Sequence, residues 1–160
     1  MLPLAHRLMS SGSKTGSCAA LATDRGEGTV TVTNSKLYTG VGQTSGSGSP
    51  LIYSTGTITV SKTTGTSYVS QIACIEGKNS ITLTDCDLIG YGKGNRYVNG
   101  NYVDLAGVFL YQSMSGDADV GTAKFQATNT KLTIASDSSY YKSAPMFYVT
   151  NTAANINLKN

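Results

Sequence analysis

The sequence carries little charge, and what charge it has is dispersed. Only 13% of the 160 residues are Asp, Glu, Lys or Arg, and the twelve Lys and Arg residues are scattered singly rather than in runs. A nucleic-acid-binding surface usually shows as a cluster of basic residues, so the sequence argues against a nucleic-acid partner. No stretch approaches the ~18 to 20 consecutive apolar residues of a membrane-spanning helix, so we expect no membrane span.

Histidine and cysteine are also scarce, which limits the chemistry available. The only histidine, His6, lies near the start of the chain, so the remainder holds no Ser-His-Asp or Cys-His arrangement. The three cysteines, Cys18, Cys74 and Cys86, are an odd number without CxxC spacing, which argues against a zinc or redox motif. We interpret them as small buried apolar residues and leave a disulfide between two of them open.

The start of the chain differs from the rest. Residues 1–9 are apolar, but they lack a basic n-region and are interrupted by proline and charged residues, which makes a poor signal peptide. Residues 10–17 are rich in serine and glycine and are typical of a linker. We expect a flexible tail over residues 1–17 and one domain over residues 18–160, in a reading frame that starts inside a longer exported protein.

Small hydroxyl-bearing residues and glycine are what the sequence has in abundance. Glycine alone accounts for 18 of the 160 residues, and serine and threonine occur throughout. A surface covered by hydroxyl groups is typical of a secreted or cell-surface β protein, which is the location we expect.

One short pattern recurs along the chain. Residues 29–37, 80–88 and 124–132 each alternate apolar and polar side chains over five positions, then make a polar step and end on leucine. The three copies align Val30 with Ile81 and Phe125, Val32 with Leu83 and Ala127, and Asn34 with Asp85 and Asn129. The same alternating pair occurs five times, at Val30/Val32, Ile58/Val60, Ile81/Leu83, Phe125/Ala127 and Ile156/Leu158. Period-two alternation predicts a β-strand in each copy.

A second, more strongly apolar segment precedes each alternating strand. These segments are residues 19–22, 51–53, 72–75, 108–111 and 146–149. A β-sandwich of hairpins and a parallel solenoid both fit such a series, but hairpin turns are scarce: the one Asn-Gly dipeptide, Asn99-Gly100, lies in a polar loop. Units repeated every 20 to 45 residues or so, with no helical periodicity, favour a parallel solenoid. We expect the apolar segments and the inward residues of the alternating strands to fill its interior.

Five phrases of the sequence carry a resemblance to a known family. They are residues 20–32 (ALATDRGEGTVTV), 50–60 (PLIYSTGTITV), 75–84 (IEGKNSITLT), 110–118 (LYQSMSGDA) and 145–152 (PMFYVTNT). In these the chain resembles bacterial exported proteins of the pectate-lyase-like superfamily, specifically the non-catalytic, carbohydrate-binding type. The resemblance implies an all-β fold, a single-stranded right-handed parallel β-helix of about five coils, as part of a longer solenoid.

Four loops follow the recurring pattern and are the predicted site of function. Residues 38–49, 63–70, 89–107 and 133–144 hold seven of the ten tyrosines, and insertions at one point of successive coils project from one face. Exposed aromatic rings stack on sugars, and lysine and arginine bind hydroxyl or uronate groups. The predicted carbohydrate-binding residues are Tyr91, Lys93, Arg96, Tyr97, Tyr102, Tyr140, Tyr141 and Lys142. The alternative is that each tyrosine simply packs over a coil with its hydroxyl in water.

A weaker prediction concerns calcium. Asp117 and Asp119 stand two residues apart in a glycine turn, a spacing that Asp85 and Asp87 repeat. Calcium takes six to eight oxygen ligands, so two carboxylates need help from backbone and water. We retain Asp117 and Asp119 as candidate ligands of an optional Ca²⁺, beside the alternative that they are turn formers.

The sequence favours a non-enzymatic role. Arg25, beside Asp24, is the best candidate for a lyase base, but its column continues to Glu76 and Asn151, which indicates a structural corner. We predict a secreted or cell-surface module that binds polysaccharide, acidic glycans included. The alternatives are a structural adhesin or filament segment that self-associates through its coil ends, and a polysaccharide lyase.

Overall fold

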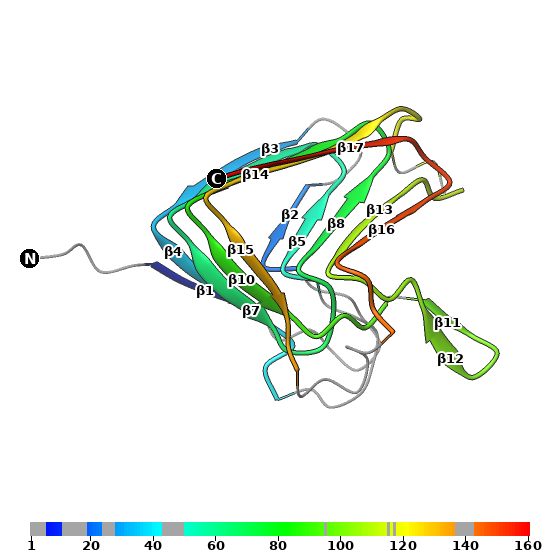
Figure 1. Ribbon diagram of the computed structural model, residues 1–160, viewed down its shortest axis with the longest axis horizontal. Helices are drawn as coiled ribbons and strands as arrows, with labels where there is room; N and C mark the ends of the chain where they lie inside the picture. Colours follow the sequence, from blue (N-terminus) through cyan, green and yellow to red (C-terminus); the bar gives the residue numbers. More distant parts are fainter. Residues whose placement is uncertain are drawn as a thin grey trace, which may run out of the picture.

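The computed structural model describes residues 6–10, 19–23, 28–42, 50–94, 96–114, 116, 118–136 and 143–160. This part of the chain contains 17 β-strands and no helix. Fifteen of the strands form three parallel sheets of five strands each, which enclose a triangular cross-section (Figure 1).

The strands are grouped by sheet as follows. Sheet 1 has the order β1 (His6–Ser10), β4 (Ser35–Thr39), β7 (Thr64–Ser67), β10 (Asp87–Gly90) and β15 (Lys131–Ile134). Sheet 2 has the order β2 (Leu21–Ala22), β5 (Ile52–Ser54), β8 (Ala73–Glu76), β13 (Val108–Tyr111) and β16 (Phe147–Thr150). Sheet 3 has the order β3 (Thr29–Thr33), β6 (Thr57–Ser61), β9 (Ser80–Thr84), β14 (Ala123–Thr128) and β17 (Ala154–Lys159). The remaining strands, β11 (Arg96–Val98) and β12 (Asn101–Val103), form an antiparallel hairpin.

Each coil of the solenoid takes one strand from each sheet. The chain passes from sheet 1 to sheet 2 to sheet 3 and then begins the next coil directly above, so that equivalent strands pair in parallel. This arrangement confirms the predicted parallel β-helix of about five coils.

The register of sheet 3 confirms the predicted columns. Val30 pairs with Ile58, Ile58 with Ile81, Ile81 with Phe125 and Phe125 with Ile156. The second column runs in the same way through Val32, Val60, Leu83, Ala127 and Leu158. Because side chains alternate across a strand, this register directs both columns into the interior.

A sharp corner joins sheet 3 to sheet 1 in every coil, and one backbone conformation makes it. Asn34, Lys62, Asp85 and Asn129 all have positive φ angles, between 46° and 54°. Asparagine and aspartate tolerate this left-handed conformation better than most residues, which explains the polar column seen in the sequence. In two adjacent coils the side chains also bond, with Asn129 Nδ2 donating to Asp85 Oδ1 at 2.6 Å.

The next residue in each corner secures the turn. Thr63 Oγ1 donates to Ser61 O at 2.8 Å and accepts the Ser35 amide at 3.3 Å. Thr130 makes the equivalent bonds two corners along: it donates to Thr128 O at 2.9 Å and accepts from the Cys86 amide at 3.2 Å. Small hydroxyl side chains therefore satisfy backbone groups that the turn leaves unpaired.

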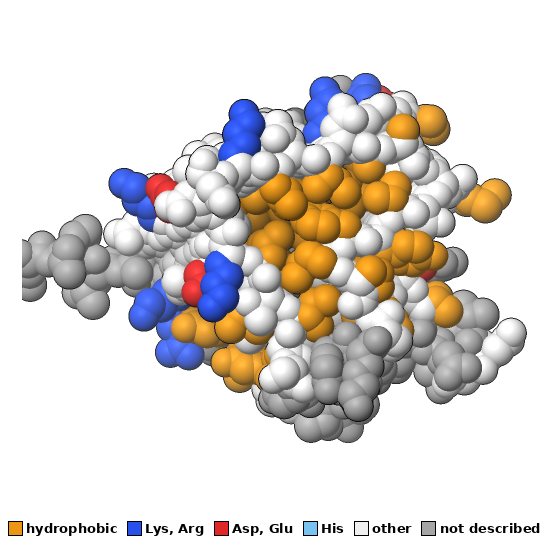
Figure 2. Space-filling view, viewed as in Figure 1, with side chains coloured by type: hydrophobic (Ala, Val, Ile, Leu, Met, Phe, Trp, Pro, Cys, Tyr) orange, Lys and Arg blue, Asp and Glu red, His pale blue; other side chains and the backbone are white. Residues whose placement is uncertain are grey.

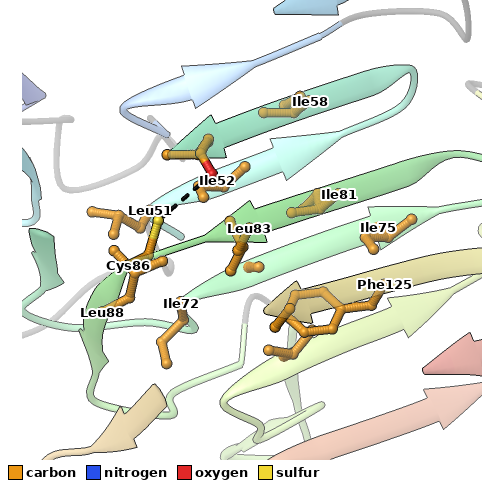
Figure 3. Close-up of a cluster of buried hydrophobic side chains, with 14 of the residues drawn as sticks. Leu51, Ile52, Ile58, Ile72, Ile75, Ile81, Leu83, Cys86, Leu88 and Phe125 are labelled. Carbon is orange, nitrogen blue, oxygen red and sulfur yellow. Dashed lines mark hydrogen bonds between the residues drawn. The ribbon is translucent and has the colours of Figure 1, made fainter. Parts of the chain in front are cut away.

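The interior is a continuous column of aliphatic side chains. In Figure 3, Ile58, Ile81 and Phe125 from sheet 3 lie in register, and Ile52 and Ile75 from sheet 2 reach toward them. The thiol of Cys86 also points inward, with Sγ 3.6 Å from Val60 O. All of these side chains are buried, so they supply the hydrophobic stabilisation of the fold.

Sheet 1 is the element that the sequence did not reveal. We expected loops to leave directly after the leucine of the recurring pattern, but Tyr38 lies inside β4 and residues 64–67 form β7. The leucine column is Leu37, Gly65, Leu88 and Leu132, so glycine replaces leucine in one coil. A Cβ on that glycine would lie 2.7 Å from Leu51 Cδ2, so Leu51 occupies the space instead.

The N-terminal region also contributes to sheet 1. Residues His6–Ser10, which the sequence placed in a flexible tail, form β1 and pair in parallel with β4. The serine-rich residues 11–18 lie outside the described part of the chain. In the described part, no helix is long and apolar enough to cross a membrane.

Candidate functional site

The outer face of sheet 2 carries a stripe of aromatic side chains. Strand pairing sets Tyr53, Cys74, Phe109 and Tyr148 side by side in one column, while the residues on either side of each point into the core. The Phe109 ring lies 5.6 Å from the Tyr148 ring, between centroids. It also stacks on Tyr111, two residues along the same strand, at 4.5 Å and an interplanar angle of 12°.

The sequence suggested that the apolar segments before the alternating strands lie wholly in the interior. The structure shows that four of them do not, namely residues 51–53, 72–75, 108–111 and 146–149. They alternate, with aliphatic residues and Phe147 inward and mostly aromatic residues outward. Residues 104–106 cover part of the outer face of sheet 2, where Ala106 is buried against Cys74 and Phe109. Apolar side chains are therefore buried on both faces of these strands.

A buried carboxylate anchors the aromatic stripe. Glu76, only 1% exposed, accepts hydrogen bonds at Oε2 from Tyr53 (2.5 Å) and Tyr111 (3.2 Å). The two phenol oxygens lie 3.0 Å from each other, and the Ser113 hydroxyl donates to Glu76 Oε1. Because one carboxyl group accepts all three hydrogen bonds, Glu76 fixes the orientation of Tyr53, Tyr111 and Ser113.

Burial changes the acidity of the groups in this network. It raises the pKa of the Tyr53 phenol, and the hydrogen bond to Glu76 raises it further. Burial also raises the pKa of Tyr111, with the hydrogen bond to Tyr53 adding to the effect. The Cys74 thiol has a raised pKa because it is buried and lies near the carboxylates of Asp104 and Glu76. The phenols and the thiol therefore stay protonated at neutral pH.

A groove opens beside the stacked rings. Its volume is about 550 Å³, and its lining residues are Asp104, Phe109, Tyr111, Gln112, Ser113, Met114, Thr150 and Asn151. A smaller pocket of about 230 Å³ is lined by Val103, Asp104, Leu105, Ser143, Pro145 and Tyr148. Asp104 borders both, so the two form neighbouring parts of one surface depression along sheet 2.

Asp104 enters the groove wall from the loop between β10 and β13. It follows the β11–β12 hairpin directly, adopts a positive φ of 60°, and its carbonyl accepts a hydrogen bond of 3.0 Å from Gln71 Nε2. The loop predicted to carry function therefore does supply a groove residue, although it is an aspartate that the sequence did not single out.

On the opposite side, the corner after β13 shapes the groove. Gln112 Nε2 donates to Ser113 O at 3.2 Å and to Ala118 O at 3.1 Å, which ties the corner to itself. Asn151, with a φ of 57°, donates from Nδ2 to Gln112 O at 3.0 Å and links the corner to the next coil. Gln112 Oε1 is buried without a hydrogen-bond partner in the described part of the structure.

Two of the predicted carbohydrate-binding residues lie away from this groove. Tyr91 is half-buried, and its ring lies 6.2 Å from that of Tyr68, between centroids. Lys93 is 1% exposed, and its carbonyl accepts a hydrogen bond of 3.0 Å from Ser70 Oγ. The structure therefore places the Lys93 side chain inside the protein, where it is not accessible to a glycan.

For the other predicted binding residues, the structure describes either the backbone alone or nothing. Arg96, Tyr97 and Tyr102 lie in the β11–β12 hairpin, where Arg96 pairs with Val103 and Tyr97 with Tyr102. The hairpin projects beyond the edge formed by β13 and β16 (Figure 1). Tyr140, Tyr141 and Lys142 lie outside the described residues, so their part in binding stays a prediction.

The candidate calcium ligands are also only partly described. Asp119 pairs with Lys78, with Oδ2 and Nζ 2.7 Å apart on the surface, and this lysine lowers the pKa of the aspartate. Asp117 lies outside the described residues. Within the described ranges, no group of three or more His, Cys, Asp or Glu residues is placed to hold a metal ion.

The sequence does contain a signal for the aromatic stripe. Strands of sheet 2 carry aliphatic side chains at alternate positions and aromatic ones between, as in Val108-Phe109-Leu110-Tyr111. Read with period two, this pattern separates an inner from an outer face. Continuous apolarity concealed it, because a strand covered on both sides looks uniformly buried.

Comparison of the chain with protein-family models, with curated proteins and with solved structures finds no match.

Proposed function

We propose that this protein is a non-catalytic module that binds polysaccharide in the groove on the outer face of sheet 2. The observation that carries the proposal is the partly exposed ring of Tyr111, which stacks on the buried Phe109 and lines a groove of about 550 Å³ together with hydrogen-bonding side chains. Aromatic rings provide apolar contact for the C–H face of a sugar, and neighbouring polar groups bind its hydroxyls.

The groove is pre-organised for such a ligand. Glu76 holds the Tyr111 phenol and the Ser113 hydroxyl, and both residues line the groove. A fixed binding surface loses less conformational entropy when a ligand binds, which favours affinity.

The lining favours neutral or amino-bearing sugars over uronates. Asp104 is the one charged residue that lines the groove among those described, and no Lys or Arg does so. Although Asp104 is only 5% exposed, a carboxylate in the groove wall repels another carboxylate. We therefore narrow the expected ligand from glycans in general to neutral and basic ones.

A lyase or hydrolase role has less support. Glu76 is almost fully buried and already accepts three hydrogen bonds, so it is not available as a catalytic acid or base in contact with substrate. This leaves Asp104 as the single carboxylate on the groove wall among the described residues, whereas glycoside hydrolysis requires a pair. We propose that the protein acts outside the cell, at the surface or secreted, and that it belongs with the pectate-lyase-like proteins it resembles.

Binding to a glycan array, with and without EDTA, tests the proposal. We expect retention of neutral or amino-bearing polysaccharides, and loss of at least tenfold in affinity for Tyr111→Ala, since about 1.4 kcal/mol of lost stacking corresponds to tenfold. Tyr68→Ala, at an exposed tyrosine outside the groove lining, is the matched control and should bind normally. If no glycan is retained under either condition, the proposal is wrong. An unsaturated product from polygalacturonate, detected by ultraviolet absorbance, would instead indicate a lyase.

A further inference from the structure

The outer face of sheet 3 carries a regular array of hydroxyl groups. On β3, β6 and β9 the residues between the core positions are all threonine or serine, namely Thr29, Thr31, Thr33, Thr57, Thr59, Ser61, Ser80, Thr82 and Thr84. Their neighbours along each strand, such as Ile58 and Val60, belong to the core. Since side chains alternate across a strand, the hydroxyl-bearing residues of these three coils share one outer face.

Strand pairing arranges these residues in two dimensions. Thr31 pairs with Thr59 and Thr59 with Thr82, and the columns on either side of them run in the same register. Neighbouring strands lie about 4.8 Å apart, and alternate residues of a parallel strand lie about 6.6 Å apart. In one column the hydroxyls also bond each other, with Ser61 Oγ donating to Thr33 Oγ1 at 3.0 Å. The backbone therefore sets a repeat in both directions of the face.

The side chains of this face have little freedom to move. Most of them are threonine, whose branching at Cβ restricts rotation about the first side-chain bond. Each threonine thus presents one hydroxyl and one methyl group at a position that the strand fixes. A surface that is ordered in advance loses little conformational entropy when a partner binds.

The face is accessible and uncharged. Thr29, Thr31, Thr33 and Thr57 are exposed, and the other members lie half-buried between neighbouring strands. Coils added at either end of the stack would extend this lateral face rather than cover it. In Figure 2, seen along the stack, the upper edge that sheet 3 forms in Figure 1 is mainly white, with a few Lys or Arg side chains and with hydrophobic ones inside the triangle.

Charge and aromatic rings are both missing from the outer positions of β3, β6 and β9. Charge appears on this face only from β14 onward, with Lys124 and Lys159. A neutral face suits a neutral partner. A polysaccharide is not favoured here, because sugar rings bind against aromatic side chains, as on sheet 2.

We propose that this face of sheet 3 binds the surface of ice. Water molecules in hexagonal ice are neutral, donate and accept hydrogen bonds, and repeat in two dimensions at spacings close to those of the array. A threonine hydroxyl also both donates and accepts, and its methyl group contributes apolar contact. The proposal is independent of the glycan groove, whose residues lie on the outer face of sheet 2.

Uptake of the fluorescently labelled protein into a slowly growing ice hemisphere tests the proposal. We expect the parent protein to be enriched in the ice fraction relative to a non-binding marker protein. Thr59→Lys should fall to the level of the marker, because a long charged side chain at the centre of the array interrupts both repeats. Thr64→Lys is the matched control: it makes the same change at an exposed position of sheet 1 and should enter ice as the parent does. Circular dichroism verifies that both variants are folded.

Exclusion of the parent protein from ice to the same extent as the marker would overturn the proposal, as would equal loss of uptake in the two lysine variants. Tyr111→Ala should enter ice normally, so failure of ice binding and failure of glycan binding are distinguishable. Pelleting with insoluble cellulose examines the other occupant. Retention on cellulose that Thr59→Lys abolishes, together with exclusion of the parent protein from ice, would assign the face to a polysaccharide instead.

Discussion

Tyr53 and Glu76, 23 residues apart in the sequence, are joined across neighbouring strands by a hydrogen bond of 2.5 Å from the phenol to Oε2. Pairing of β5 with β8 in parallel, with Tyr53 opposite Cys74, brings the tyrosine within reach of the glutamate two residues further along β8. The bond ties the aromatic stripe to the groove wall, because the same carboxylate also holds Tyr111 and Ser113.

This network predicts a loss of stability at alkaline pH. The pKa values of Tyr53 and Tyr111 are raised in the folded protein, chiefly by burial, whereas an unfolded tyrosine titrates near pH 10. Above about pH 10 the unfolded chain releases protons that the folded protein retains. The contribution of these tyrosines to the free energy of unfolding is therefore fully present below that pH and is lost as the pH rises further.

Urea unfolding between neutral and strongly alkaline pH measures this effect. Tyr53→Phe should reduce the steepness of the alkaline decline, because it removes one of the protons that the folded protein retains. Tyr68→Phe, at an exposed tyrosine, serves as the control and should leave the steepness as it is in the parent protein. A decline equally steep in Tyr53→Phe would contradict this account of the network.

The middle coils should be far more sensitive to truncation than the last one. Leu83 and Leu158 occupy the same column, but Leu83 is fully buried and Leu158 is largely exposed. We expect Leu83→Ala to lower the free energy of unfolding by about 2–5 kcal/mol, because it leaves a cavity in the core. Leu158→Ala should lower it by less than about 1 kcal/mol, because little apolar surface of Leu158 is buried. Urea titration of both variants provides the comparison.

Lys62 is the least suitable residue in the corner between sheets 3 and 1. It adopts a φ of 48° where the other coils have Asn34, Asp85 and Asn129. Replacement by asparagine relieves part of the cost of a left-handed conformation, and we expect Lys62→Asn to raise the free energy of unfolding by up to about 1 kcal/mol. Lys124→Asn, at an exposed lysine within β14, should not stabilise the protein. Thermal and urea unfolding of the two variants measure the change in the free energy of unfolding. An equal change in both variants would contradict backbone strain at Lys62.

The thiols of Cys74 and Cys86 should resist alkylation while the protein is folded. Both are buried, and burial raises the pKa of each, so little reactive thiolate forms. Iodoacetamide labelling followed by peptide mass mapping should show modification of these two positions only after addition of denaturant. Rapid labelling of Cys74 in the native protein would mean that the covering residues 104–106 open readily.

The sequence by itself determined the repeat and the register of sheet 3. The alternation at Val30/Val32 and its four successors has the period of a strand, and equivalent positions in a solenoid stack on one another. The polar column of Asn34, Asp85 and Asn129 was also visible in the sequence, and the structure shows that it marks a left-handed corner, a conformation that few other residues accept. These features are local, so a linear sequence can record them.

Only the tertiary structure determined where the candidate binding groove lies and which residues line it. Sheet 1 escaped notice because its short strands follow a corner directly and one of its leucines is replaced by Gly65, whose space Leu51 fills from another part of the coil. Strands of sheet 2 looked buried on both sides until the structure showed that Phe109 and Tyr111 face outward. Pairing between coils and the path of a long loop bring together Tyr53, Glu76, Tyr111 and Asp104. The spacing of residues along the chain predicts neither of these.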